Sequence, residues 1–153
     1  MFGSMAQHIV ALGGRVLLSL IFLASAVGHV LDWSGSTSYM TSYGMPMVHV
    51  FLAGAVAFLF VGGLSVLLGL RARWGAVMLI VFLIPTTLIF HAFWTIDPAE
   101  AVERKMQMIQ FLKNLGLIGG LLMVLAHGSG SLGLDMFFRD KLVNLFRRKP
   151  KAA

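Results

Sequence analysis

The sequence contains no cysteine and few charged residues. The absence of cysteine excludes disulfide bonds, thiolate metal sites, thiol–disulfide relays and cysteine nucleophiles. Charged residues make up 12% of the chain, about half of the share that soluble domains carry. Hydrophobic residues make up 58% of the 153 residues, and a chain this short cannot bury them all inside its own core. The surplus of apolar surface therefore predicts a membrane protein.

Acidic residues are also scarce, since 6 Asp and Glu stand against 12 Lys and Arg. A basic surplus can indicate nucleic-acid binding, but no platform of interleaved basic and aromatic residues is present. The surplus is concentrated near the C-terminus, directly after the last apolar segment. We therefore expect it to orient the chain and to contact anionic lipid, with no nucleic acid among the partners.

Four apolar segments predict an all-α, four-helix transmembrane bundle, because each has close to the roughly 20 residues that cross a bilayer. They extend from Ile9 to Leu31, from Met47 to Leu70, from Trp74 to Trp94 and from Met106 to Ala126. The first is expected to be a mature helix, since it is long and has neither a basic start nor a signal-peptide cleavage site. The polar stretch from Asp32 to Pro46 is expected to be a loop.

Basic residues are distributed unequally between the two sides of these predicted helices. One side has Arg71, Arg73 and the basic residues of the C-terminal tail, whereas the other has only Arg104 and Lys105, together with three acidic residues. By the positive-inside rule, both termini are predicted to be cytoplasmic.

The sequence divides into a transmembrane domain, 1–134, and a basic amphipathic tail, 135–153. Apolar residues of the tail share one helical face, which predicts a helix lying on the inner leaflet, and docking of a partner protein is the alternative. Arg147 and Arg148 are expected to contact lipid. Arg15, about two turns into the first segment, is expected to extend to the same interface or to bind lipid phosphate.

Ionisable and amide side chains within spans are costly, so each is a candidate for function. Under the predicted topology these residues lie in the outer half of the bundle, and Gln107, Gln110 and Asn114 share one face of the last helix. We predict a polar ligand-binding pocket there. Its candidate residues are His29, His91, Trp94, Gln110, Lys113 and Asn114.

The same residues could instead anchor the helices in the membrane. Polar and aromatic side chains are common near the water boundary, and Lys113 could extend along its helix to water. A metal site is not expected, because no His-x-x-x-His or Glu-x-x-His pair lies on one helix.

The chain resembles the DoxX family of bacterial membrane proteins over nearly its whole length. The resemblance is carried by several short stretches, of which the order and spacing are the most specific feature. They are Gly14-Arg15-Val16-Leu17-Leu18, Ser25-Ala26-Val27-Gly28-His29, the stretch 62–70 with Arg73, Phe90-His91-Ala92-Phe93-Trp94, Phe111-Leu112-Lys113-Asn114-Leu115, Gly119-Gly120-Leu121-Leu122 and Ser131-Leu132-Gly133-Leu134-Asp135.

The resemblance implies a four-helix bundle in the bacterial inner membrane. It also implies a role beside a redox system, since the family is named after a subunit of a thiosulfate:quinone oxidoreductase. His91, Lys113, Asn114 and Arg15 match positions of the family. The chain departs from many relatives at His29, where they have Lys, and at 58–60, where they have a carboxylate.

We therefore expect an accessory subunit of a redox or oxidative-stress system that binds a quinone or a small anion in the outer pocket. It would work with a membrane or soluble redox partner or as a homo-oligomer. The alternative is a non-catalytic scaffold that docks a partner protein. Catalysis by the chain alone is not expected, because no haem-ligand pair or nucleophile–base arrangement is present. Transport of a solute is also disfavoured, since broken helices and internal repeats are lacking.

Overall fold

The computed structural model describes residues 4–130 and 132–136, and every regular element in these ranges is helical. The helices are α1 (Ser4–Leu31), α2 (Trp33–Ser42), α3 (Val48–Leu68), α4 (Ala72–Phe90), the short 3-10 helix η1 (Phe93–Thr95) and α5 (Ala101–His127). Four of them, α1, α3, α4 with η1, and α5, are long and apolar enough to cross a membrane. The prediction of four transmembrane helices is therefore confirmed.

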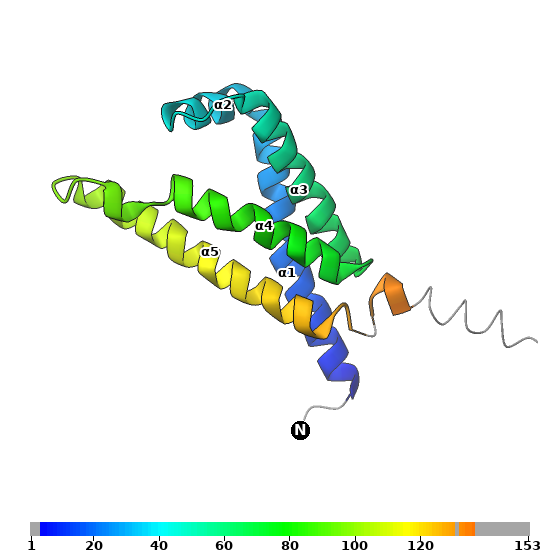
Figure 1. Cartoon of the computed structure of the whole chain (residues 1–153). Helices are drawn as coiled ribbons and strands as arrows, with labels where there is room; N and C mark the ends of the chain where they lie inside the picture. Colours follow the sequence, from blue (N-terminus) through cyan, green and yellow to red (C-terminus); the bar gives the residue numbers. More distant parts are fainter. Residues whose placement is uncertain (1–3, 131, 137–153) are drawn as a thin grey trace, which may run out of the picture.

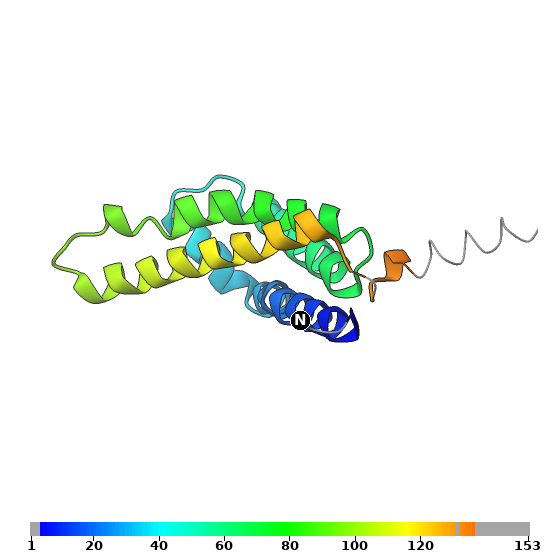
Figure 2. The same ribbon diagram turned by 90° about the horizontal axis from the view of Figure 1, so that it is seen from below.

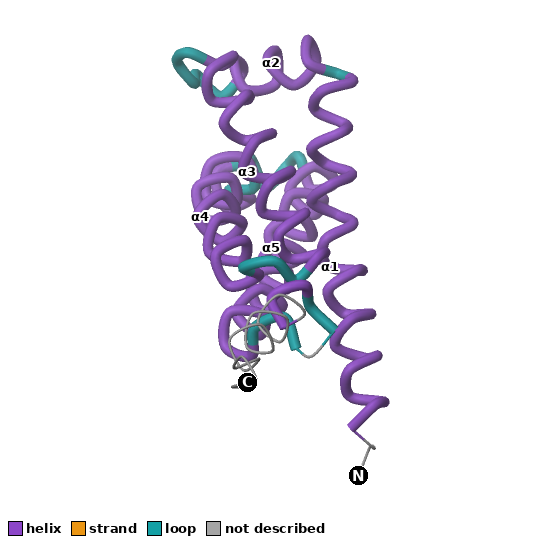
Figure 3. Tube along the Cα trace, turned by 90° about the vertical axis from the view of Figure 1, so that its right-hand side faces the viewer, coloured by secondary structure: helices purple, strands orange, loops and turns teal. Residues whose placement is uncertain are grey.

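The four long helices converge at one end of the molecule and separate at the other. α4 and α5 lie side by side, and α1 and α3 diverge from this pair toward α2 (Figures 1 and 2). We call the two ends the turn end, which holds the α3–α4 turn, and the α2 end. The described residues nearest both termini lie at the turn end (Figure 3).

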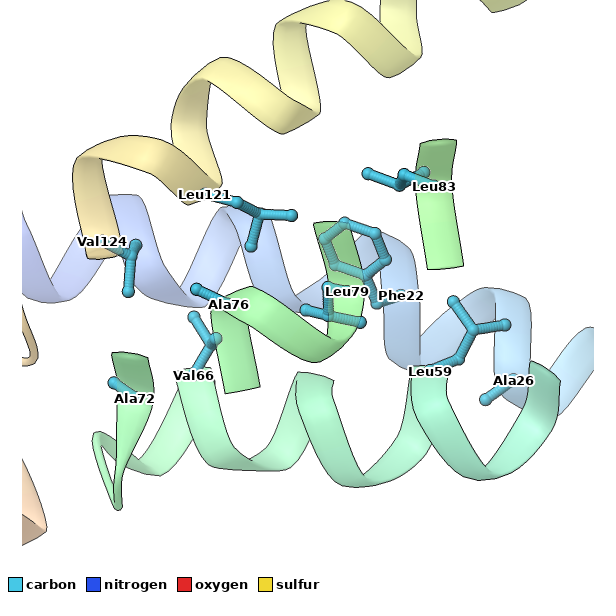
Figure 4. Close-up of a cluster of buried hydrophobic side chains, with 10 residues drawn as sticks. All are labelled: Phe22, Ala26, Leu59, Val66, Ala72, Ala76, Leu79, Leu83, Leu121 and Val124. Atoms are coloured by element: carbon cyan, nitrogen blue, oxygen red, sulfur yellow. The ribbon is translucent and has the colours of Figure 1, made fainter. Parts of the chain in front are cut away.

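The core lies between all four long helices (Figure 4). Phe22 of α1, Leu59 of α3, Leu79 of α4 and Leu121 of α5 are each at most 2% exposed. Side chains on the opposite faces of these helices are largely exposed, as expected where a helix faces lipid instead of water. A narrow buried stripe on each helix is thus what holds the bundle together.

Two glycines bring α3 and α4 into close contact. A Cβ atom added to Gly75 would lie 2.9 Å from the carbonyl oxygen of Gly62, and one added to Gly62 would lie 2.8 Å from the side chain of Leu79. Small residues are the usual means by which membrane helices approach closely, because lipid supplies no hydrophobic force between helices. Gly116 and Gly119 on α5, by contrast, have nothing within 4 Å of an added Cβ.

The expectation of a loop from Asp32 to Pro46 is wrong, because ten of these residues form α2. Asp32 caps this helix by accepting a hydrogen bond from the Gly35 backbone N–H at 3.0 Å. Thr37 and Met40 are buried against the bundle. Burial of this face outweighs the weak helix propensity of a segment rich in Ser, Thr and Gly.

At the turn end, residues that follow α5 return to the α3–α4 turn. The Asp135 backbone N–H donates to the Gly69 carbonyl at 3.2 Å, and its carboxylate accepts from the Arg71 backbone N–H at 2.8 Å. Asp135, which the sequence assigned to the tail, thus contacts the transmembrane domain. The predicted interfacial helix, with Arg147 and Arg148, falls mainly on 137–153, outside the described residues.

Candidate functional site

A cavity of about 690 Å³ opens between α1, α2, α3 and α4 at the α2 end. Its walls are mainly apolar, with Leu52 and Phe58 from α3 and Phe82 and Ile89 from α4. The size falls within the range of about 300–1,000 Å³ that is usual for small-molecule sites, which combine apolar walls with a few polar groups.

The polar groups of the cavity come from α1, α2 and the end of α4. His29 Nδ1 and Ser36 Oγ form a hydrogen bond of 2.9 Å that joins the end of α1 to α2. Asp32 and Tyr39 also line the cavity. Asp32 is the one charged residue in the lining within the described part of the chain, since no lysine or arginine contributes to it.

His91 is held in one orientation at the edge of the cavity. Its Nδ1 lies 2.8 Å from Oε1 of Gln107 on α5. Because an amide oxygen only accepts hydrogen bonds, Nδ1 is the donor in this arrangement, and in the neutral tautomer Nε2 is then the acceptor. The site therefore combines an acceptor on His91 with a hydroxyl donor on Tyr39.

Tyr39 of α2, which lines the cavity, and Tyr43, which follows α2, lie at the end of α4. Tyr39 and Tyr43 pack on Phe90 with ring centroids 5.5 and 5.0 Å away. The Tyr43 hydroxyl donates to the Phe90 carbonyl oxygen at 3.3 Å. Partial burial raises the pKa of Tyr39 to about 12, and its hydrogen bond with Tyr43 acts in the same direction. Tyr39 thus stays protonated at neutral pH, and it donates its single proton to Tyr43, because Tyr43 donates its own to Phe90.

The structure brings together two of the six residues predicted for the pocket, His29 and His91. Asn114 is buried away from the cavity, and its Nδ2 donates to Thr87 Oγ1 at 3.0 Å across the α4–α5 interface. Gln110 is half-buried on α5 and does not line the cavity.

The two remaining residues also lie apart from the cavity. Lys113 is exposed on the outside of α5. Trp94 is 51% exposed and packs edge-on against Phe93 and Phe111. The predicted stripe on the last helix thus faces α4, not the space between α1 and α4.

Sequence reasoning missed the contribution of α2, because the segment was expected to be a loop. Asp32 directly before the helix is a usual capping residue, and Tyr39 and Tyr43 are spaced by four residues, as neighbours on one helical face are. These two signals could have identified α2. In the described residues, no group of three or more His, Cys, Asp or Glu side chains is placed to hold a metal ion.

Four helices long and apolar enough to span a membrane, together with relatives named as inner membrane proteins, define the class of protein as a multi-pass inner membrane protein. The family model DoxX matches residues 10–92, more than half of the chain. The chain therefore belongs to the DoxX family.

Relatives cover most of the chain. It is 29% identical over 136 residues to the inner membrane protein YqjF of Escherichia coli, covering 88% of this chain and 96% of that protein. It is 30% identical over 134 residues to the inner membrane protein YphA of the same organism, covering 88% and 93%. It also matches a Surfeit locus protein 4 homolog of Schizosaccharomyces pombe at 30% identity, over 81% of this chain but 36% of that protein. No solved structure matches the chain.

Proposed function

We propose that the chain is an accessory membrane subunit of a redox or oxidative-stress system and that it binds a quinone in the cavity between α1, α2, α3 and α4. The observation that carries this proposal is the composition of the cavity, in which apolar walls of α3 and α4 lead to a few hydrogen-bonding groups. A quinone has the same division, with an apolar ring and tail and two carbonyl oxygens.

Charge favours an uncharged ligand over the small anion that the sequence also suggested. The cavity is lined by one carboxylate, Asp32, and by no lysine or arginine of the described chain. An anion would have to leave water without a cation to compensate for its lost hydration, which is strongly unfavourable. A quinone carbonyl needs only a neutral donor, and Tyr39 supplies one.

The hydrogen-bonding groups suit both oxidation states of a quinone. The Tyr39 hydroxyl would exchange its hydrogen bond to Tyr43 for one to a carbonyl of the oxidised ring, and Nε2 of neutral His91 would accept from a hydroxyl of the reduced ring. The chain itself has no cysteine to exchange electrons. Electrons would therefore be exchanged with a partner protein, and the role of this chain would be to bind and orient the ring.

Filling the cavity tests the proposal. Gly54 lines the cavity, and a Cβ added there meets nothing within 4 Å, so Gly54→Leu should occupy ligand space without displacing core residues. A short-chain benzoquinone should raise the unfolding temperature of the wild type in detergent, and Gly54→Leu should lose this rise.

Gly119→Leu is the matched control, because Gly119 is equally open but lies on α5 outside the cavity. It should keep the quinone-dependent rise, as should Lys113→Ala. Equal stabilisation of the Gly54→Leu variant, or no stabilisation of the wild type by benzoquinones and naphthoquinones, would contradict the proposal.

Docking of a partner protein in the membrane is a second candidate function, favoured by Lys113. This side chain is exposed near the middle of α5, in a segment apolar enough to span a membrane. A lysine facing lipid at that depth costs a few kcal/mol unless it pairs or extends to water. If Lys113 pairs with a partner, Lys113→Met should release from the purified complex a protein that Arg104→Met retains. An unchanged set of co-purifying proteins would count against this function.

We also propose that the turn end faces the cytoplasm. Arg71 and Arg73 belong to this end, whereas Arg104 and Lys105 begin α5 at the other. A reporter that is active only in the cytoplasm should be active when fused after Ala153 and inactive when inserted after Pro98. The reverse pattern would overturn this orientation.

A further inference from the structure

A second, smaller cavity lies at the turn end, far along the bundle from the candidate quinone site. Its volume is about 380 Å³, and it lies between the start of α4 and the chain that follows α5. Arg71, Arg73 and Trp74 line one side, and His127, Ser129 and Asp135 line the other. None of these residues belongs to the candidate quinone site.

The charge around this cavity is positive. Arg71 and Arg73 are exposed, whereas the single carboxylate in the lining, Asp135, is engaged by the Arg71 backbone N–H. The positive end of the α4 dipole also points to this side, because α4 begins at Ala72. An anion entering the cavity would therefore meet more positive than negative charge.

Arg15 adds a buried charge to the same end. It is 4% exposed and reaches the turn at Gly69. Its Nη2 donates to the Leu132 carbonyl oxygen at 3.3 Å, while Nε and Nη1 have no hydrogen-bond partner among residues 4–130 and 132–136. A buried guanidinium without a full set of acceptors is costly, and a nearby anion lowers that cost.

Trp74 places the cavity at the membrane surface. It is 70% exposed in the first turn of a spanning helix, and tryptophan at such positions lies at the level of the lipid headgroups. An anion at this depth next to a hydrocarbon phase is most simply a phosphate that belongs to a lipid. Basic pockets between spanning helices commonly bind such headgroups.

We propose that the cavity lined by Arg71, Arg73 and Trp74 is a binding site for the phosphate group of an anionic phospholipid. The exposed guanidinium groups of Arg71 and Arg73 donate charge-assisted hydrogen bonds to the phosphate oxygens. Trp74 packs beside the upper part of the acyl chains. Arg73 also donates to the Ala126 carbonyl oxygen at 3.3 Å, so lipid bound here stabilises the junction of α4 and α5.

Arg71 offers a variant that removes charge with little harm to the fold. Its φ is +49°, in the left-handed region that asparagine adopts more readily than other non-glycine residues. Arg71→Asn therefore keeps the turn and the backbone N–H that Asp135 accepts from. Arg104→Asn is the control, because it removes the same charge at the opposite end of the bundle.

The experiment titrates full-length protein in neutral detergent with phosphatidylglycerol, phosphatidylcholine or inorganic phosphate and records the unfolding temperature. Phosphatidylglycerol should stabilise the wild type at lower concentration than phosphatidylcholine. Arg71→Asn should weaken this apparent affinity on the order of fivefold, as expected for about 1 kcal/mol per arginine at a lipid surface. Arg104→Asn should leave it unchanged. All variants share the same C-terminal residues, so any contribution from these is common to them.

The two sources of phosphate are separated by the inorganic phosphate titration. Stabilisation by inorganic phosphate that Arg71→Asn weakens would support the same site with a free anion as its ligand. Equal stabilisation by phosphatidylcholine and phosphatidylglycerol would overturn the proposal, as would equal affinities in the Arg71→Asn and Arg104→Asn variants. Arg73→Gln, measured in the same way, gives an independent reading should Arg71→Asn not elute as a folded protein.

Discussion

The two ends of the bundle differ in how their helices meet. At the turn end α3 and α4 are joined by a short turn, and the Asp135 carboxylate accepts a hydrogen bond from the backbone N–H of Arg71, the last residue of that turn. At the α2 end the pair α1 and α3 separates from α4 and α5 (Figure 1). A cavity of about 690 Å³ lies at this end between α1, α2, α3 and α4. The contrast indicates that the turn end holds the fold together, so that the α2 end can keep space for a ligand.

The interactions differ in kind as well. Near the turn end, glycine contacts and apolar packing, with Ala72 and Ala76 at most 1% exposed, are accompanied by hydrogen bonds between side chains and backbone groups, as between Arg73 and Ala126. Toward the α2 end, hydrogen bonds between two side chains join the helices, as between Asn114 and Thr87 and between His91 and Gln107. Substitutions should therefore affect global stability at the turn end and local structure at the α2 end.

The largest effect is expected from adding a methyl group at the close contact between α3 and α4. Gly75→Ala places a methyl group 2.9 Å from the Gly62 carbonyl oxygen, a backbone atom that cannot move alone. We expect a loss of about 1–3 kcal/mol in unfolding free energy. Thermal unfolding in detergent measures it, and Gly119→Ala on the open face of α5 should lose nothing. If the two variants were equally stable, the α3–α4 contact would tolerate a methyl group as well as the open face of α5 does, which would contradict this prediction.

Removal of an aspartate that accepts a backbone N–H should have different consequences at the two ends. Asp135→Ala deprives the Arg71 N–H of its acceptor at the turn end and should cost about 0.5–2 kcal/mol of global stability. Asp32→Ala removes the cap of α2 and should increase hydrogen exchange in 33–42 with little change in unfolding temperature. The comparison fails if both variants lower the unfolding temperature equally.

A smaller effect is expected where one hydrogen bond joins α4 and α5. Asn114→Ala removes the 3.0 Å bond to Thr87, and such bonds in membrane proteins contribute about 0.6 kcal/mol on average. A double-mutant cycle with Thr87→Val isolates the interaction. A coupling energy indistinguishable from zero would show that this hydrogen bond adds nothing to the packing of α4 on α5.

The last effect, a pH dependence at the α2 end, is absent at neutral pH and appears only in strongly alkaline solution. The pKa of Tyr39 is raised to about 12, so the folded α2 end favours the neutral phenol. Its stabilising effect is fully present below the unfolded pKa of about 10 and is lost as pH rises through 12. The chain has 2 tyrosines, so tyrosinate absorbance of Tyr43→Phe reports Tyr39 alone. The pKa of Tyr39 should be somewhat lower in this variant than in the wild type, because the hydrogen bond with Tyr43 is lost. A Tyr39 pKa near 10 in the variant would contradict the effect of burial.

The candidate site was only partly predictable. His29 and His91 were identified because polar residues in apolar segments are conspicuous, and both line the cavity. Lys113 was conspicuous for the same reason but is exposed. The polar stripe on α5 was read correctly as one face, yet Asn114 uses that face to bind Thr87 of α4 instead of a ligand. Periodicity identifies residues on one face of a helix, but it does not identify the neighbour that the face meets.

The sequence by itself determined the four spanning helices and the membership of the DoxX family, because hydropathy and the order of motifs are properties of the chain alone. Which helices enclose the cavity, and the helical conformation of Trp33–Ser42, depend on the tertiary structure. It also brought Asp135 back to the Arg71 turn. These features depend on contacts between segments far apart in the chain, where burial and geometry outweigh local preference.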